Sequence, residues 1–129
     1  MNEVVNLGAK LASFREFWSP KLIAELNGQH VRLARLRGEF LWHAHAEEDE
    51  LFLVLEGRLR IHLRDGGPGG AERTVELAPG ELFVVPRGVE HKPVADSETA
   101  VLLFEPAGTV NTGDARDART LAPGDIERI

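Results

Sequence analysis

The chain has 129 residues and a formal net charge of −6 at pH 7, with 43% hydrophobic and 28% charged residues. These values predict a single globular domain with its own core, and the absence of cysteine excludes disulfides and thiolate metal sites. The acidic charge without a basic stripe argues against nucleic acid as a partner. Neither a signal peptide nor an apolar run long enough to span a membrane is visible, so we expect a cytoplasmic protein.

The N-terminal region contains one segment with two readings, "SPKLIAEL" at residues 19–26. Ser19 and Pro20 would suit the cap and first turn of a helix. The same residues could form one strand of a hairpin that turns at Asn27-Gly28, because Asn-Gly is the preferred dipeptide of two-residue hairpin turns. We favour the hairpin.

From residue 30 onward, short apolar and alternating segments are separated by glycine and proline. This spacing is typical of an all-β sandwich or barrel. A loop is expected at residues 65–72, and the polar tail after residue 106 is expected to be a loop or an arm packed along the barrel. The expected strands cover residues 30–36, 39–45, 50–57, 58–64, 73–80, 81–86, 89–94 and 99–106.

Two histidines and an acidic run stand close together in "HAHAEEDELFLVL". On a strand, His43 and His45 would project from the same face, as two ligands of one metal would, although an isolated pair could equally be half-exposed edge residues. Residues 47–49 read as a solvated turn. Glu50 differs, because it shares a strand face with apolar residues, and a carboxylate there is costly unless a positive partner neutralises it.

The remaining histidines carry weaker signals. His91 follows a Pro86-Arg87-Gly88 turn and could be an ordinary surface residue beside Lys92. His62 lies on the arginine-rich face of its strand, and His30 lies beside the expected turn, so neither is assigned a ligand role.

Taken together, two spaced patterns resemble the two motifs of the cupin superfamily. The first is Gly38-x4-His43-x-His45-x4-Glu50-x6-Gly57, and the second is Gly80-x5-Pro86-x-Gly88-x2-His91. The chain departs from the family pattern twice: four residues rather than the frequent five separate Gly38 from His43, and Ala95 stands where asparagine is frequent. Neither departure touches a ligand position, but both weaken assignment to a particular enzyme branch.

The resemblance implies an antiparallel jelly-roll β-barrel (a double-stranded β-helix) in a single all-β domain. It further implies that His43, His45, Glu50 and His91 bind a divalent metal, and that the protein forms a homodimer. The sequence looks most like small bacterial cupins described as mannose-6-phosphate isomerase-like. We expect N-terminal strands or a hairpin in residues 1–29, the barrel in residues 30–105 and an arm in residues 106–129, all within one domain.

Three imidazoles and a carboxylate suit divalent Zn, Fe, Mn or Ni, and the sequence does not select among them. One hypothesis is a metal-dependent enzyme of isomerase or dioxygenase type that acts on a small oxygen-bearing molecule such as a sugar, keto acid or diol. The alternative is a non-catalytic binding or sensor domain whose metal is mainly structural.

No catalytic residue is assigned from the sequence. Arg87 and Lys92 flank the expected site and could either hold an anion or be ordinary surface charges. An acid–base group would have to lie near the metal, where the candidates by proximity are Glu47, Glu48 and Glu90. The expected lining of the barrel mouth is Phe40, Leu41, Trp42, Phe52 and Phe83.

Overall fold

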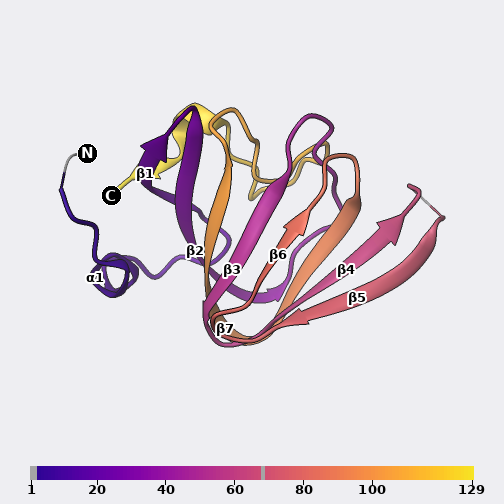
Figure 1. The fold of residues 1–129 in the computed structure, drawn as a ribbon, viewed down its shortest axis with the longest axis horizontal. Helices are drawn as coiled ribbons and strands as arrows, with labels where there is room; N and C mark the ends of the chain where they lie inside the picture. Colours follow the sequence, from indigo (N-terminus) through magenta and orange to yellow (C-terminus); the bar gives the residue numbers. More distant parts are fainter. Residues whose placement is uncertain (1–2, 68) are drawn as a thin grey trace.

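The computed structural model describes residues 3–67 and 69–129, and it is an all-β jelly roll with one short helix (Figure 1). Met1 and Asn2 of the expected N-terminal region and Pro68 of the expected loop lie outside the described residues. Within the described part of the chain, no helix is long and apolar enough to cross a membrane. The elements are α1 Leu7–Ala12, β1 Lys21–Leu26, β2 Gln29–Glu39, β3 Glu50–Glu56, β4 Leu59–Asp65, β5 Ala71–Leu77, β6 Leu82–Val85, β7 Glu90–Pro106, the 3-10 turn η1 Pro123–Asp125 and β8 Glu127–Arg128.

The long strand β7 organises the barrel, because it pairs with three other strands. Along one edge it runs antiparallel to β2, and along the other it pairs first with β4 and then with β3. The strands follow the order β5-β4-β7-β2-β1-β8; off this path, β3 pairs with β7, and β6 pairs with β3. Every pairing is antiparallel except the short one between β1 and β8. A strand that changes partners in this way curls the sheet into two facing layers.

Burial follows the alternation that the sequence predicts. In β4, Leu59, Ile61 and Leu63 are fully buried, whereas the basic residues between them are not. These three belong to the main core inside the barrel, and a second cluster around Leu11, Phe14 and Leu33 lies where the N-terminal segment packs on β2. Aliphatic side chains therefore fill the barrel interior next to β4.

The expected hairpin at Asn27-Gly28 is confirmed. Lys21–Leu26 pairs with β2 through a register that closes at Leu26 and Gln29. Both turn residues have positive φ, 49° for Asn27 and 75° for Gly28. Positive φ at both central positions is the requirement of the type I′ turn, whose twist matches that of the strands.

Two expectations about secondary structure were wrong, and one helix was missed. Residues 39–45 do not form a strand: β2 ends at Glu39, and beyond it only His43 makes an isolated bridge. The expected strands at 89–94 and 99–106 are one continuous strand, β7. The helix α1 was not anticipated; it begins at an Asn6 cap whose side chain accepts a hydrogen bond from the Ala9 amide at 2.9 Å.

Gly57 closes β3 at a place where the next chain segment leaves no room for a side chain. Its φ is +83°, and a Cβ built there would lie 2.5 Å from Thr99 Oγ1 and 2.7 Å from the Glu98 carbonyl oxygen. Gly28 has a similar φ of +75°, but nothing lies within 4 Å of its Cβ position. A side chain at Gly57 would therefore meet both backbone strain and crowding, whereas a side chain at Gly28 would meet backbone strain alone.

We predict that Gly57→Ala lowers the free energy of unfolding by about 3 kcal/mol, because overpacking adds to the strain of positive φ. Gly28→Ala should cost only about 1 kcal/mol, from strain alone. Chemical denaturation of both variants measures the difference. Equal losses would mean that the contact between Gly57 and Thr99 does not constrain the fold.

Candidate metal centre

Backbone hydrogen bonds alone bring His43 and His91, the first and last of the four predicted ligands, next to each other. His43 and His91 exchange two hydrogen bonds, His43 N–H to the His91 carbonyl at 3.0 Å and His91 N–H to the His43 carbonyl at 2.8 Å. His91 lies near the start of β7, and Glu50 is the first residue of β3. The side chains of His43, His45, Glu50 and His91 are all buried, at 0–4% exposure.

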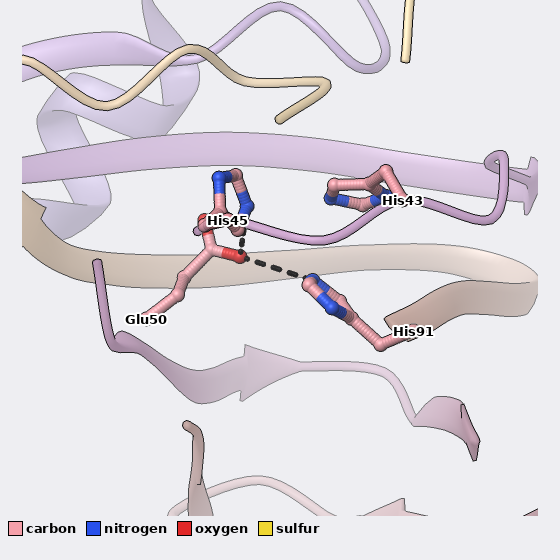
Figure 2. Close-up of side chains that lie close together, drawn as sticks. All are labelled: His43, His45, Glu50 and His91. Carbon is pink, nitrogen blue, oxygen red and sulfur yellow. Dashed lines mark ion pairs between the residues drawn. The ribbon is translucent and has the colours of Figure 1, made fainter. Parts of the chain in front are cut away.

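The four side chains point toward one centre, as Figure 2 shows. Glu50 Oε1 lies 3.4 Å from His45 Nε2 and 3.4 Å from His91 Nε2. His43 and His91 each donate Nδ1–H to a carbonyl two residues back in the chain, those of Leu41 and Val89, at 2.9 Å. These bonds fix the tautomer and leave Nε2 of both rings with a free lone pair.

Several polar atoms at this centre are buried without a hydrogen-bond partner. Among the described residues, they include both ring nitrogens of His45, Nε2 of His91 and Oε1 of Glu50. Unpaired buried polar groups are rare in folded proteins and costly. One ligand atom from each of the four side chains lies within 4.8 Å of the others. Metal–nitrogen bonds of about 2.1 Å place atoms on one ion up to about 4.2 Å apart, so the donor atoms would have to draw slightly closer to share one divalent transition metal.

The pKa values of Glu50, His45 and His43 depend on burial and on the charges of their neighbours. Burial opposes ionisation of Glu50, but the neighbouring Glu105, His45 and His91 side chains outweigh it and hold the Glu50 pKa well below its ordinary value. Burial also opposes protonation of His45, yet the adjacent Glu50 carboxylate raises the His45 pKa. Burial and the neighbouring His91 lower the pKa of His43 to about 3. The centre therefore retains a carboxylate and at least one neutral imidazole, which are the charge states that metals bind.

Behind Glu50 lies a buried ion pair that no sequence motif indicated. Glu105, 1% exposed, accepts a hydrogen bond from the fully buried Arg32 guanidinium at 2.6 Å. Its other oxygen, Oε2, is buried without a hydrogen-bond partner. Burial and the charge of Glu50 raise the Glu105 pKa well above its ordinary value. The alternation of β7 could have shown that Glu105 faces inward, but nothing in the sequence pairs it with Arg32.

A mostly apolar cavity opens beside the four-residue cluster. Its volume, counted as space for water-sized molecules, is about 40 Å³, and it is partly open to solvent. Trp18 and Phe40 stack at its edge with ring centroids 4.7 Å apart. Trp18 has an unusual φ of 58°, and its position is fixed by hydrogen bonds to the carbonyls of Arg35 and Arg37. The lining comprises Trp18, Pro20, Ala34, Leu36, Phe40, His43, Glu50, Phe52, Pro93, Val101, Leu103, Glu105 and Asn111.

Of the five aromatic or apolar residues expected at the barrel mouth, Phe40 and Phe52 line the cavity. Leu41, Trp42 and Phe83 do not. Trp42 instead lies under the Arg64 guanidinium, 3.8 Å from its ring centroid. Trp18 was missed because it lies outside both motifs, in a segment with no strand pattern.

The five charged residues expected near the site do not line the cavity, and three of them pair with residues outside the cluster. Arg87 binds Asp49 through its backbone N–H and its guanidinium, and Lys92 pairs with Glu39. Glu90 pairs with Arg64, while Glu47 is exposed. Glu48 comes no nearer to the cluster than a 4.0 Å approach to His45 Nδ1. None of the five lines the cavity.

The two histidines without a predicted ligand role lie apart from the cluster. His30 is buried between Arg32 and Glu25, which is 3.0 Å from its Nε2. His62 shares a 2.7 Å hydrogen bond with Thr74 on the outer face of β4.

Comparisons with known proteins agree with this architecture. The family model described as "Cupin domain" matches residues 29–105. The uncharacterized protein YdbB of Bacillus subtilis (strain 168) is 34% identical over 105 residues, which cover 81% of this chain and 88% of that protein. The crystal structure of a cupin-2 domain protein from Shewanella frigidimarina is 43% identical, with a TM-score of 0.73, covering 80% of this chain and 94% of the other.

A more distant similarity concerns the fold alone. Hydroquinone 1,2-dioxygenase PnpCD, solved in complex with Cd²⁺ and 4-hydroxybenzonitrile, superposes with a TM-score of 0.64 at 19% identity. The match covers 75% of this chain and 69% of the dioxygenase chain.

The burial of His43 generates a prediction for the metal-free protein. Its imidazole should stay neutral from pH 7 down to about 4, because its folded-state pKa of about 3 lies far below the ordinary 6.5. Between these two values the unfolded chain binds a proton that the folded chain does not, so the stability contributed by His43 declines as pH falls through this window. An NMR titration of the imidazole C–H resonances measures the midpoint. A midpoint near 6.5 would contradict the buried position.

Proposed function

The chain belongs to the cupin family, and on that premise we propose that His43, His45, Glu50 and His91 bind a divalent transition metal that holds a small oxygen-bearing molecule in the barrel. The observation that carries the proposal is the set of buried, unpartnered donor atoms converging from three separate segments. A bound cation would satisfy Glu50 Oε1, His91 Nε2 and one ring nitrogen of His45 together, and no described lysine or arginine side chain is among the residues that line the cavity around them.

The donor set favours Zn, Fe, Mn or Ni as the divalent ion. Three imidazoles and one carboxylate leave one or two coordination positions of a five- or six-coordinate ion for an exogenous oxygen. When bound, such an ion can polarise a carbonyl or lower the pKa of a coordinated hydroxyl. The residues of the chain itself orient the donors through the Leu41 and Val89 carbonyls and exclude water with the apolar wall.

The cavity lining narrows the class of molecule. Apolar side chains dominate, and the nearest buried cation, Arg32, is engaged by Glu105, His30 and two backbone carbonyls. A phosphate or sulfate group would therefore lose its hydration without gaining a counter-charge from the wall. This supports a small diol, keto compound or phenol over a phosphorylated sugar. The resemblance to mannose-6-phosphate isomerase-like cupins therefore concerns the fold, and we do not propose mannose 6-phosphate as the substrate.

A non-catalytic binding or sensor role is the second candidate, and one observation favours it. Outside the four-residue cluster, Glu105 is the one carboxyl group among the described residues that line the cavity, and it is already engaged by Arg32. An isomerase needs a base close to the proton that it moves. No such base stands free in the described lining. This supports a protein whose metal binds a ligand without converting it.

We also retain the homodimer as a proposal. The edge strand β6 pairs only with β3 among the described strands, and it exposes Leu82 at 56% and Val84 at 43%. An open edge with apolar side chains is a surface that a second copy of the chain could cover.

The first prediction of this proposal concerns metal uptake. Wild-type protein purified without chelators should bind about one Zn²⁺ or Fe²⁺ per chain, and the melting temperature should rise with metal concentration. Glu50→Gln and His91→Ala should weaken metal binding by more than the roughly 10–100-fold that loss of an outer-shell hydrogen bond costs. Isothermal titration calorimetry and elemental analysis measure both quantities.

His62→Ala is the matched control, because it removes an imidazole on the outer face of β4 and should leave metal affinity unchanged. If the wild-type protein takes up far less than one ion per chain, or if His62→Ala weakens binding as much as His91→Ala, the assignment of the ligands is wrong.

The second prediction separates an enzyme from a binding module. If the protein is an enzyme, metal-loaded wild type should convert small diketones, keto acids or phenols, with Fe²⁺ and dioxygen supplied in one arm of the assay. The His43→Ala/His91→Ala double variant should lack this turnover. Chromatographic product analysis is the measurement, and binding of these compounds with equal, negligible turnover in both proteins would support the non-catalytic role.

A further inference from the structure

The chain segment after β7, residues 107–121, lies outside the region matched by the cupin family and yet reaches the proposed metal centre. We call this segment the arm. Its root is fixed inside the molecule, because the fully buried Arg32 guanidinium donates hydrogen bonds to the Ala107 carbonyl at 3.3 Å and the Thr109 carbonyl at 3.1 Å. The same guanidinium holds Glu105, so the arm begins from a rigid point of the barrel wall.

The arm is also cross-linked within itself. The hydroxyl of Thr112, which is fully buried, contacts the Ala115 carbonyl at 2.7 Å and the Thr120 hydroxyl at 2.8 Å. The Asn111 amide donates to the Arg119 carbonyl at 2.8 Å and accepts from the Leu121 N–H at 2.7 Å. A loop held by side-chain bonds of this kind keeps a defined shape without being part of a sheet.

The tip of the arm, at Gly113 and Asp114, contacts Ala44, the residue between two of the predicted ligands. Ala44, between His43 and His45, donates its N–H to Asp114 Oδ1 at 2.9 Å, and its carbonyl accepts the Asp114 N–H at 3.0 Å. The approach is as close as the backbone permits, because a Cβ on Gly113 would lie 2.3 Å from the Ala44 carbonyl oxygen. It would also lie 3.2 Å from Cδ2 of the His43 ring.

The far end of the arm contacts the start of the same segment. Arg119 donates Nη1–H to the Glu39 carbonyl at 3.1 Å, and its guanidinium lies 4.6 Å from the Phe40 ring centroid. Asn111 lines the cavity together with His43. The arm therefore holds the segment 39–45 at both ends.

This contact matters because the segment lacks a strand ladder. Between the end of β2 and the start of β3, His43 makes the one isolated bridge found among the described residues there, with His91. Besides the His43–His91 pair, Phe40 N–H donates to the Pro93 carbonyl at 3.0 Å and Gly88 N–H donates to the His45 carbonyl at 2.7 Å, so the arm acts together with these few bonds in setting the directions of the His43 and His45 side chains. Outer-shell hydrogen bonds commonly serve this purpose for metal ligands.

We propose that the arm is a positioning element of the metal centre, in which the paired hydrogen bonds between Asp114 and Ala44 fix the directions of the His43 and His45 side chains. This inference rests on the proposed function, because those histidines are ligands only if the cluster binds metal. Asp114 touches neither the ion nor its ligand atoms, and acts through the backbone of Ala44.

The experiment compares three variants of the full chain. Asp114→Ala removes the acceptor for the Ala44 N–H, Asp114→Asn keeps an oxygen acceptor but removes the charge, and Asp125→Ala makes the same charge change elsewhere in the C-terminal region, in the η1 turn. Asp114 is exposed, so the substitutions should leave the barrel folded. Zn²⁺ affinity is measured by competition with a chromogenic chelator, and the ligand field is read from the visible spectrum of Co²⁺-loaded protein.

Asp114→Ala should weaken Zn²⁺ binding about tenfold or more and alter the Co²⁺ spectrum. Asp114→Asn should restore both toward wild type, and Asp125→Ala should match wild type. If Asp114→Asn behaves like Asp114→Ala, charge rather than hydrogen bonding is responsible, and the positioning role is overturned. Unchanged affinity in Asp114→Ala overturns it as well.

A second readout in metal-free protein keeps the two proposals distinguishable. Asp114→Ala should raise the amide exchange rate of Ala44 at least about tenfold, because its hydrogen bond is lost, and should shift the His43 and His45 imidazole resonances but not that of His62. If wild type binds no metal, the proposed function fails. The role of the arm in orienting the two imidazoles is then still decided by the amide exchange rate and the imidazole resonances. Unchanged exchange and resonances overturn it whatever the metal result.

Discussion

The structure depends on a carboxylate that is placed where carboxylates are rarely stable. Glu50 is 4% exposed, its Oε1 has no hydrogen-bond partner, and its pKa is held well below the ordinary value by the groups around it. A charge buried in this way needs a positive partner in contact. The partners within reach are imidazoles, which can supply a proton at His45 or share a metal ion. The three histidines and the cavity beside them follow from this one requirement.

The barrel meets the requirement by bringing distant residues to one point. The strand β7 carries His91 near its beginning and Glu105 near its end, so one continuous element places both a predicted ligand and the carboxyl group behind Glu50. In the middle of β7, where the sequence suggests a break, Asp96 binds Arg60 at 2.6 Å and Glu98 binds Arg35 at 3.2 Å. The arm then completes the site from outside the barrel.

Much of the barrel could be predicted from sequence, because period-two burial and the Asn27-Gly28 turn are local signals. The buried face of β4 and the hairpin follow directly from them. The four-residue cluster was predicted as a set only through the resemblance of two spaced motifs to the cupin superfamily. The segment 39–45 shows the limit: its sequence alternates as a strand would, but Phe40 and His43 both line the cavity, and the arm contacts the segment where a neighbouring strand was expected. The Arg32–Glu105 pair and Trp18 depend on contacts between segments far apart in the chain. Local patterns carry no information on such contacts.

The central claim is that one divalent ion binds to His43, His45, Glu50 and His91 together. Crystals of protein purified without chelators or nickel resin, measured on both sides of the absorption edge of the metal found by elemental analysis, test it most directly. The account predicts a single anomalous peak per chain within about 2.0–2.3 Å of three imidazole nitrogens and one Glu50 oxygen. No peak at this position, or a peak held by other residues, would contradict it.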